Sequence, residues 1–580
     1  MEFLKDSFKQ TGRKYDKVFT PEETIQRVRR ILEERGYKIC RDLVRIDKGR
    51  LGIPVYISLY SAEAASLTGF HKQMGKGAEP LQAEASALME LVERFSLFSF
   101  VKQNKYEVET FSRLGEEAID LEELFRAVHD EENLSNDRLR ELLQEIPFHF
   151  TKAYDVRNQK MVSIPFFWFW LIHEYNGSAA GNSLAEAAVQ ATCELVERHV
   201  SSLVTYETLR TPTIHPASLS GSCAELLERF TRLGIKVWLK DFTLGLGIPS
   251  VGALAIDPST YPHRSEIVYT AGTATSPERA LIRALTEVAQ LAGDFDTDGK
   301  YAESGLPKFA TLDEAQYVID TPSLVNLSDL PSVASDNFRE EVEALSQALN
   351  ERGLNLYLVD ITHPEIGVPA VYAVIPGCHF RDRTIGIDLP FHLARLLAER
   401  RPPAEALKWL GVLDEVCPNR FDIAFYQGVA YEGLGAYDQA LASFERALAL
   451  NPRPEEIANI YCHIGLCHKE KEDYRQAISA LEKAASYNNG LKEIFNLKGF
   501  CHYKLKEHEA AIACFVKAIE IDPTSAIDYA NIGSNFRELG LYREAIRWYE
   551  TALSLDPGID FARENLERLK PLIEAQTSHG

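Results

Sequence analysis

Two segments of the sequence carry the same pattern of acidic side chains. Ala85–Arg94 and Val189–Arg198 share the ending Glu-Leu-Val-Glu-Arg. Both segments predict helices, and side chains three or four residues apart lie on one face of a helix. The second pattern starts earlier and continues over about four turns. The polar residues on these faces are Ser86, Glu90 and Glu93 in the first segment, and Asn182, Glu186, Gln190, Glu194 and Glu197 in the second.

The surroundings of these acidic faces predict a metal site. The neighbouring positions are mostly Ala, Leu, Val, Met and Phe, so both helices should be largely buried. Buried carboxylates repel one another and are costly to desolvate unless a cation lies among them. Mg²⁺, bound through carboxylate and phosphate oxygens, would meet that need. Two such helices facing each other would hold a nucleoside triphosphate through its metals. The alternative is a solvated face whose Glu residues pair with neighbouring Arg side chains.

Two further motifs supply positive charge. Gly75-Lys76-Gly77 precedes the first acidic helix, and a lysine between glycines can present its ammonium and nearby backbone N–H groups to phosphate. It is not a Walker A loop, because Gly-x-x-x-x-Gly-Lys-Ser/Thr is absent from the sequence. A third helix begins at Ser276-Pro277, with Ser as the N-cap and Pro at the first helical position. It carries Arg283, which would neutralise phosphate or, alternatively, form a surface ion pair.

In order and spacing, these motifs resemble the YcaO family over about residues 15–380. The matching stretches are Gly-Lys-Gly, Ser-Ala-x-x-Glu-x-x-Glu-Arg, Gly-Asn-x-x-x-Glu with a second Glu-x-x-Glu-Arg, and Arg-Ala-Leu-Thr-Glu-x-x-Gln. The resemblance implies an enzyme that uses ATP and Mg²⁺ to activate a peptide backbone amide by phosphorylating its oxygen. It implies Glu90, Glu93, Glu194 and Glu197 as metal ligands, and Arg198 and Arg283 as catalytic residues. The implied nucleotide contacts are Lys76, Ser86, Glu90, Asn182, Glu186, Gln190, Arg198 and Arg283.

The resemblance leaves the product open. A nucleophile would attack the activated amide carbon and give azolines by cyclodehydration, thioamides by thioamidation, or amidines. Azoline-forming members end in a proline-rich tail, whereas this chain ends Ala575-Gln-Thr-Ser-His-Gly580, which argues against azolines. The third helix also continues Leu-Ala-Gly-Asp after Gln290, where the family often has an Arg. A C-terminal repeat domain is similar to non-azoline members linked to methylthiolation of a ribosomal protein.

Two other functions compete with amide activation. The first is an ATP-binding scaffold or adaptor whose repeats recruit protein partners and whose ATP turnover is weak or vestigial. An intact set of costly buried carboxylates speaks against a pure scaffold. The second is an ATP-grasp-like ligase that joins an amine to a carboxylate. The absence of a Walker or grasp loop disfavours it.

The elements that must position these residues indicate a YcaO-like α/β (α+β) catalytic domain over residues 1–385. Helical periodicity and capping residues predict helices at Glu22–Glu34, Leu81–Ser96, Leu184–Val200 and Pro277–Leu291. Short runs rich in β-branched and apolar residues predict strands at Gly52–Leu59, Ile248–Ala255 and Val368–Ile375.

The C-terminal third repeats with a period of about 34 residues. Each unit ends in a helix-stopping pair such as Asn451-Pro452. This pattern resembles the tetratricopeptide repeat, an all-α solenoid in which small residues let two antiparallel helices approach closely. We expect a linker and a degenerate first repeat at 386–418, then repeats with a capping helix at 419–580. The aligned glycines are Gly428, Gly465, Gly499 and Gly533.

Composition excludes several classes. The 580 residues have a formal net charge of −22, which argues against a nucleic-acid coat protein, since that protein would need a basic face. No signal peptide opens the chain, and the longest apolar run, Ile164–Ile172, is about half of the ~20 residues in a membrane helix. Nine cysteines without Cys-x-x-Cys indicate reduced thiols. We expect a cytoplasmic homodimer with no nucleic-acid or membrane partner, a peptide or protein substrate, and a sulfur donor or accessory protein on the repeats.

Three weaker features have two interpretations each. Cys467-His468 and Cys501-His502 would bind zinc or, as equivalent positions of successive repeats, pack in the core. Cys193 would act as a nucleophile or fill the core. The aromatic run Phe166–Trp170 would line a peptide or adenine pocket or form a core strand.

Overall fold

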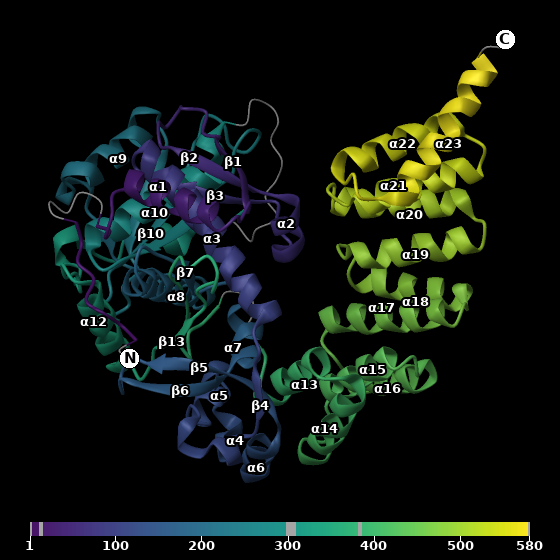
Figure 1. Ribbon diagram of the computed structural model, residues 1–580, viewed down its shortest axis with the longest axis horizontal. Coiled ribbons are helices and arrows are strands. Elements are labelled where there is room, and N and C mark those ends of the chain that lie inside the picture. The colour runs from purple at the N-terminus through teal and green to yellow at the C-terminus, as the bar shows by residue number, and fades with distance from the viewer. Residues whose placement is uncertain (1–2, 11–15, 297–308, 381–385, 578–580) are drawn as a thin grey trace. The chain divides into compact units, whose positions relative to one another are not determined.

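The computed structural model describes residues 3–10, 16–296, 309–380 and 386–577. The chain divides into two compact units, Met1–Leu389 and Pro390–Gly580 (Figure 1). The predicted fold class is confirmed, because the first unit mixes helices with strands and the second consists of helices. The expected domain boundary at residue 385 and the end of the C-terminal tail at 578–580 lie outside the described residues.

The elements expected to carry the site are present. Ser276 is the N-cap of the third predicted helix, where its side chain accepts the Arg279 N–H, and Pro277 lies in the first turn. The four predicted helices are α1 (Pro21–Glu34), α3 (Pro80–Gln103), α8 (Leu184–Tyr206) and α10 (Pro277–Ala292). The three predicted strands are β2 (Val55–Tyr60), β10 (Ser250–Ile256) and β14 (Ala370–Val374).

Three sheets organise the first unit. The first has the order β1 (Cys40–Arg45), β2 and β3 (Lys72–Lys76). The second has the order β11 (Val268–Thr273), β10, β9 (Lys236–Asp241), β8 (Thr213–Ile214) and β12 (Leu324–Val325). The third has the order β4 (Glu107–Glu109), β5 (Phe148–Asp155), β13 (Tyr357–Asp360), β14 and β7 (Ser178–Ala180), with β6 (Lys160–Pro165) paired to β5. The described pairs are antiparallel except for β8 with β12.

Shorter helices complete the first unit. The α-helices are α2 (Ala62–Thr68), α4 (Phe111–Leu114), α5 (Glu122–Ala127), α6 (Asp137–Glu145), α7 (Phe166–His173), α9 (Gly221–Arg232), α11 (Gln316–Ile319) and α12 (Phe338–Asn350). Single 3₁₀ turns lie at Gly115–Glu117, Glu132–Ser135, Pro216–Ser218, Gly293–Phe295 and Leu327–Asp329.

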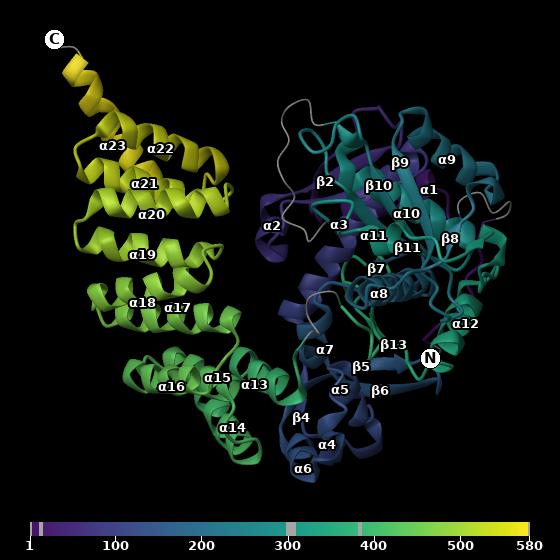
Figure 2. The ribbon, with the colours of Figure 1, turned by 180° about the vertical axis from the view of Figure 1, so that it is seen from behind.

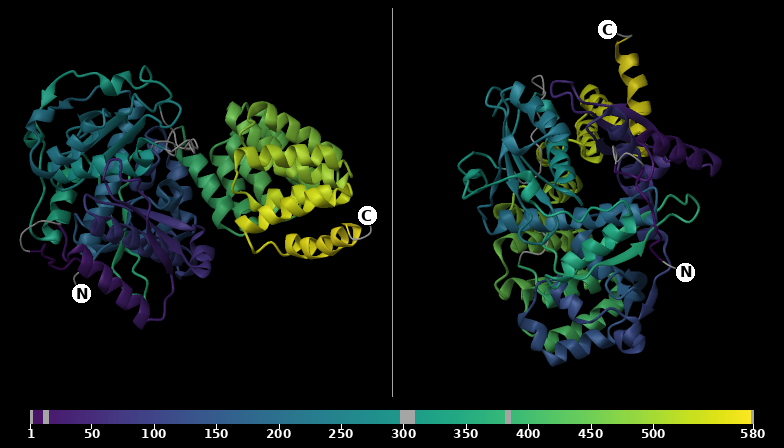
Figure 3. Two further views of the ribbon diagram at one scale, coloured as in Figure 1. Left: turned by 90° about the horizontal axis from the view of Figure 1, so that it is seen from above. Right: turned by 90° about the vertical axis from the view of Figure 1, so that its left-hand side faces the viewer.

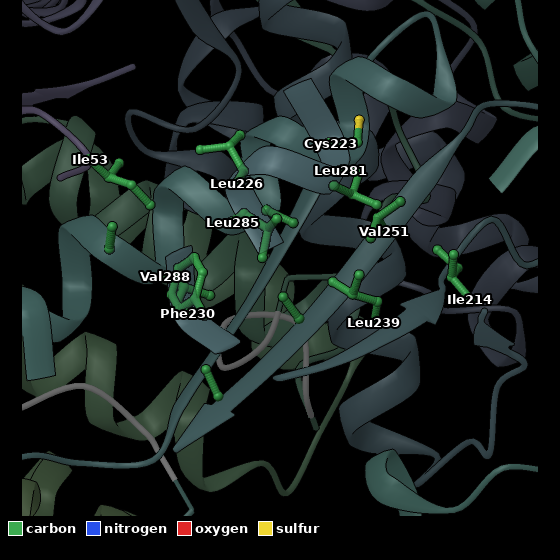
Figure 4. Packing of buried hydrophobic residues seen from close by; sticks show 14 of the residues in the cluster. Ile53, Ile214, Cys223, Leu226, Phe230, Leu239, Val251, Leu281, Leu285 and Val288 are labelled. Atoms are coloured by element: carbon green, nitrogen blue, oxygen red, sulfur yellow. The ribbon is translucent and has the colours of Figure 1, made fainter. Parts of the chain in front are cut away.

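The largest apolar cluster around the five-stranded sheet fixes α10. Leu281 and Leu285 of α10 pack with Val251 of β10 and Phe230 of α9 (Figure 4). α10 lies against β10 and β11 (Figure 2). The approach needs a glycine, because a Cβ at Gly272 of β11 would lie 2.3 Å from the Ala280 carbonyl oxygen. These contacts fix the position of α10 against β10 and β11.

The aromatic run Phe166–Trp170 is a helix, and its prediction as a strand is wrong. It forms α7, in which every residue is buried. A short apolar run that is buried on all sides has no periodicity, so its pattern cannot distinguish a helix from a strand. None of its side chains lines the cavity described below, so the run is not part of that pocket. In the described part of the chain, no helix is both long and apolar enough to cross a membrane.

The second unit is a stack of helix pairs (Figures 1 and 3). Glycine is required within each pair, since a Cβ at Gly428 would lie 2.5 Å from the Phe444 ring and one at Gly465 2.7 Å from Leu481. The helices are α13 (Leu389–Arg400), α14 (Pro403–Val416), the pairs α15 (Phe421–Gly433) with α16 (Tyr437–Ala449), α17 (Pro454–Glu470) with α18 (Tyr474–Tyr487), α19 (Lys492–Lys504) with α20 (His508–Ile521), and α21 (Ala526–Glu538) with α22 (Tyr542–Leu555), and the terminal α23 (Asp560–Thr577).

Two cysteines that suggested zinc lie in the repeat core. Cys467 and Cys501 are fully buried. Burial raises the pKa of the Cys467 thiol to about 12, which disfavours the thiolate that zinc requires. The packing interpretation therefore accounts for both residues.

Removing the capping box of α1 should destabilise the first unit modestly. Thr20 Oγ1 accepts the Glu23 N–H at 3.2 Å, and Glu23 Oε2 accepts the Thr20 N–H at 2.8 Å. The variant Thr20→Ala should lose about 1 kcal/mol of stability, because one helix N–H is left without its side-chain acceptor. Calorimetry of the unfolding transition of the first unit measures this change. Glu22→Ala, in the same turn, is the control, and equal transition temperatures for all three proteins would contradict the expectation.

Candidate active site

One cavity of about 710 Å³ is lined by every residue that the sequence proposed for metal binding, nucleotide binding or catalysis. It lies between α3 and α8 and is also bordered by β3, β11, α10 and the segment before α1. The two copies of the acidic motif therefore face one space, as the sequence predicted. The predicted residues that line it are Lys76, Ser86, Glu90, Glu93, Asn182, Glu186, Gln190, Glu194, Glu197, Arg198 and Arg283.

The carboxylates of α3 share one buried guanidinium. Arg94 Nη1 lies 3.1 Å from Glu93 Oε1, and Arg94 Nη2 lies 3.7 Å from Glu90 Oε1. Arg94 also donates to the Tyr175 carbonyl and to Ser178 Oγ, both at 2.8 Å, and Ser178 Oγ donates to Glu93 at 2.7 Å. Glu93 is therefore held in a fixed place. Both acids pair with a neighbouring Arg, as the alternative expected, but they line the cavity, and the Glu93 side chain is only 12% exposed.

The carboxylates of α8 tie that helix to its neighbours. Glu197 is buried, and its Oε2 accepts the Thr273 N–H of β11 at 3.1 Å and lies 3.6 Å from Arg283 Nη2. Glu194 Oε2 accepts the Gly177 N–H at 3.3 Å. Both side chains line the cavity and keep acceptor sites that these contacts do not use, because a carboxylate offers about four.

Asn182 and Glu186 hold the segment that precedes α1. Glu186 Oε2 accepts the Val18 N–H at 2.9 Å, and its Oε1 lies 3.6 Å from Lys17 Nζ. The Asn182 side-chain amide donates to Glu186 at 3.2 Å and to Thr24 Oγ1 at 3.1 Å. These contacts make the N-terminal segment a wall of the cavity, which no local sequence pattern indicates. The wall residues are Asp16, Lys17, Phe19, Pro21 and Thr24.

The cations of the site come from β3 and α10. The Lys76 ammonium contacts the Glu287 carboxylate. Burial, reinforced by the nearby Arg283, lowers the pKa of Lys76 to about 7. Arg283 Nη1 donates to Gln190 Oε1 at 2.9 Å, while its buried Nε has no hydrogen-bond partner within the described residues. An unused N–H beside a cavity is a suitable donor to a phosphate oxygen.

The glycines beside Lys76 have a packing role. A Cβ at Gly75 would lie 2.0 Å from the Ala87 backbone nitrogen, and one at Gly77 would lie 2.6 Å from Gln82 Cβ. They let the end of β3 touch the first turns of α3, so Lys76 projects into the cavity. Close helix–strand contact is therefore one reason for Gly-Lys-Gly, and the phosphate binding that the sequence suggested stays a prediction.

Five charged residues that line the cavity are absent from the candidates chosen by sequence: Asp16, Lys17, Arg94, Arg279 and Glu287. Arg94 is the last residue of the first acidic motif, and its match to Arg198 was the available signal. Glu287 lies one turn after Arg283, in the Thr-Glu of the third motif. Cys193 also borders the cavity, but burial raises the pKa of its thiol to about 12, which argues against a nucleophile.

The charge balance of the cavity fits a divalent cation and a polyphosphate. Burial, followed by repulsion from Glu90 and Glu194, raises the pKa of Glu93 to about 8, and burial also raises the pKa of Glu90. Carboxylates are hard oxygen donors of the kind that Mg²⁺ prefers. Within the described residues, no three acidic, histidine or cysteine side chains are close enough to coordinate one ion. Mg²⁺ commonly takes one or two carboxylates and completes its shell with phosphate and water.

Comparison with known proteins agrees with this geometry. Residues 74–379 match the family described as YcaO cyclodehydratase, ATP- and Mg²⁺-binding. An uncharacterized protein of Methanothermobacter thermautotrophicus is 29% identical over 384 residues, which cover 62% of this chain and 93% of that protein. The ribosomal protein S12 methylthiotransferase accessory factor YcaO of Escherichia coli is 26% identical over 345 residues, 52% of this chain and 56% of that protein.

A solved structure and the repeat families complete the comparison. A heterocyclase in complex with substrate and cofactor is 25% identical, with a TM-score of 0.52, over 65% of this chain and 54% of that one. Tetratricopeptide-repeat families match residues 421–454, 458–490, 493–525 and 529–559. The family match spans more than half of the 580 residues. The chain therefore belongs to the YcaO family, whose domain binds ATP and Mg²⁺, and it carries tetratricopeptide repeats after that domain.

Proposed function

We propose that the chain is an ATP- and Mg²⁺-dependent enzyme that activates a backbone amide of a peptide or protein for attack by a nucleophile. The observation that carries the proposal is the single cavity in which two acidic helices face Lys76, Arg198 and Arg283. Family membership supports ATP-dependent chemistry in this domain. A scaffold without turnover would have no use for carboxylates that are costly to bury.

The acidic and the basic residues of the cavity would have different roles. Glu90, Glu93, Glu194 and Glu197 would hold Mg²⁺, with Ser86, Asn182, Glu186 and Gln190 beside the nucleotide. Bound ATP supplies the phosphoryl group that the amide oxygen accepts. Lys76, Arg198 and Arg283 would stabilise the negative charge that develops on the phosphoryl oxygens, as fixed cations do in phosphoryl transfer.

The nucleophile decides the product. After the amide oxygen is phosphorylated, attack at the amide carbon expels that oxygen as phosphate. A sulfide nucleophile would give a thioamide, and a neighbouring thiol or hydroxyl would give an azoline with net loss of water. The name of the Escherichia coli relative favours a third possibility, which is support of ribosomal protein methylthiolation.

Mass spectrometry of the host proteome with and without this chain tests the proposal. A peptide shifted by about +16 would indicate exchange of oxygen for sulfur, and one shifted by about −18 would indicate loss of water. The proposal is overturned if no peptide is shifted while the purified protein still binds ATP with Mg²⁺. That result would favour the adaptor function.

Deleting residues 390–580 should impair substrate modification more than ATP binding. The cavity is lined by residues of the first unit alone, whereas the repeats belong to a family of protein-binding modules. Calorimetric titration of the truncated chain with an ATP analogue and Mg²⁺, beside the modification assay, separates the two roles. Light scattering of both forms tests whether the expected homodimer depends on the repeats. Loss of ATP binding on truncation would contradict this division of roles.

A further inference from the structure

The free edge of β11 borders the active-site cavity. β11 is the last strand of the five-stranded sheet and pairs with β10 on one side, with Ala271 opposite Gly252 and Thr273 opposite Ser250. In the part of the chain that the structure describes, no strand pairs with its other side. An edge strand presents a row of backbone donors and acceptors that another extended chain can use.

The direction of the backbone groups follows from the pairing. The Ala274 N–H donates to the Pro249 carbonyl, so even-numbered residues of β11 direct their backbone groups at β10. The odd-numbered residues Ala271 and Thr273 therefore direct their N–H and C=O groups away from β10. Glu197 confirms this direction, because it accepts the outward Thr273 N–H from the cavity side.

Side chains from both faces of β11 line the cavity. The Thr270 hydroxyl donates to the Ala284 carbonyl at 3.1 Å, which places Thr270 on the face toward α10. Thr273 lies on the opposite face, where its hydroxyl is 2.7 Å from that of Ser250. Because Thr270 and Thr273 both border the cavity, the cavity opens on the edge of the strand between them.

The next outward pair of groups belongs to Ala271. This residue is 7% exposed and lines the cavity, and within the described residues its outward N–H and C=O have no hydrogen-bond partner. Buried backbone groups of this kind are costly to leave unpaired, so a partner that enters the cavity would satisfy them. The partner must supply both an acceptor and a donor, and an extended peptide supplies them with the spacing of a strand.

We propose that the polypeptide substrate binds in an extended conformation as an added strand on the free edge of β11, paired with Ala271. The inference rests on the proposed function, since it names how the amide substrate is held. Strand addition recognises the backbone rather than particular side chains, which suits an enzyme whose target is itself a backbone amide. It would bring that amide alongside Glu197 and Arg283, at the acidic and cationic part of the cavity.

The variant Ala271→Pro tests the added strand. Proline removes the outward N–H and fills its place, yet an edge strand tolerates proline where the N–H points away from the sheet. The peptide identified by its mass shift should be modified about tenfold less or worse in a host that produces this variant, because a buried hydrogen bond is lost. Ala271→Ser, which keeps the N–H, separates the effect of a larger side chain and should lose much less product.

A second experiment leaves the enzyme unchanged. A synthetic copy of the mass-shifted peptide is methylated on one backbone nitrogen at a time and given to the wild-type protein with ATP and Mg²⁺. Methylation should abolish modification at every second position near the modified amide, because only alternate N–H groups of an added strand face β11. Should Ala271→Pro fail to fold or to bind nucleotide, this scan still decides the proposal.

The outcomes separate this inference from the proposed function. Full modification by Ala271→Pro, or a methylation scan without alternation, overturns strand addition and leaves amide activation standing. Absence of any mass-shifted peptide with the wild-type chain overturns both. Loss of product in the proline variant, together with an alternating scan, supports both.

Discussion

Replacing Glu90 or Glu197 by Ala should lower ATP turnover by about a thousandfold or more, because each change removes a hard oxygen donor from the proposed Mg²⁺ site. Glu197 also orients Arg283 and accepts the Thr273 N–H, so its loss would disturb the cation as well as the metal. Phosphate release by the purified protein at saturating Mg²⁺ measures the effect. Far-UV circular dichroism should match the wild type.

The fold should survive Glu90→Ala, because the charged Glu90 carboxylate is unfavourable in the folded protein when no metal is bound. Burial raises the pKa of Glu90, which means that its charged form is disfavoured in the folded protein. The matched control is Glu84→Ala on the same helix, where Glu84 pairs with Arg29 and does not line the cavity. ATP turnover retained in both Glu90→Ala and Glu197→Ala would contradict the assignment of these residues as metal ligands.

Arg94→Met should destabilise the metal-free protein by about 3 kcal/mol. The guanidinium is buried, lies beside the Glu93 and Glu90 carboxylates, and donates to the Tyr175 carbonyl. Methionine fills much of the volume but leaves the two neighbouring acids without this positive charge, and it removes one donor from the Tyr175 carbonyl. Chemical denaturation in the presence of a chelator measures the loss.

A bound cation should compensate in part for the missing guanidinium. Mg²⁺ with an ATP analogue should therefore raise the unfolding midpoint of Arg94→Met more than that of the wild type. Arg113→Met is the control, because Arg113 forms an exposed ion pair with Glu109, and such pairs contribute little to stability. An Arg94→Met protein as stable as the Arg113→Met control would show that Arg94 is not needed to balance these acids.

Regular spacing explains why many residues of the candidate site could be predicted from the sequence. Residues three and four apart must share a helix face whatever the rest of the chain does. The acidic faces of α3 and α8 could therefore be assembled from Glu90 and Glu194 and their neighbours before any contact was known. The same holds for the repeats, where Gly428 and Gly465 recur because an added Cβ would collide with the facing helix.

The aromatic run Phe166–Trp170 is a segment whose structure could not be predicted from periodicity. Its residues are buried on every side, so hydrophobicity carries no period, and the choice of α7 over a strand depends on what surrounds it. Contacts between distant segments also depend on the surroundings in the fold, so local sequence patterns do not predict them. Glu186 binds Val18, and Lys76 meets Glu287, across long stretches of chain that no local pattern connects.

Local spacing thus established the fold class, the acidic helices, the cationic motifs and the repeat array, because periodicity and capping act over a few residues. Tertiary packing decided how they combine: which segment closes the cavity beside Asn182, which cation of α10 meets Glu197, and which strand edge lies beside that carboxylate. Those outcomes depend on contacts between segments far apart in the chain, such as Thr24 with Asn182 and Glu197 with Thr273, which only the folded molecule brings together.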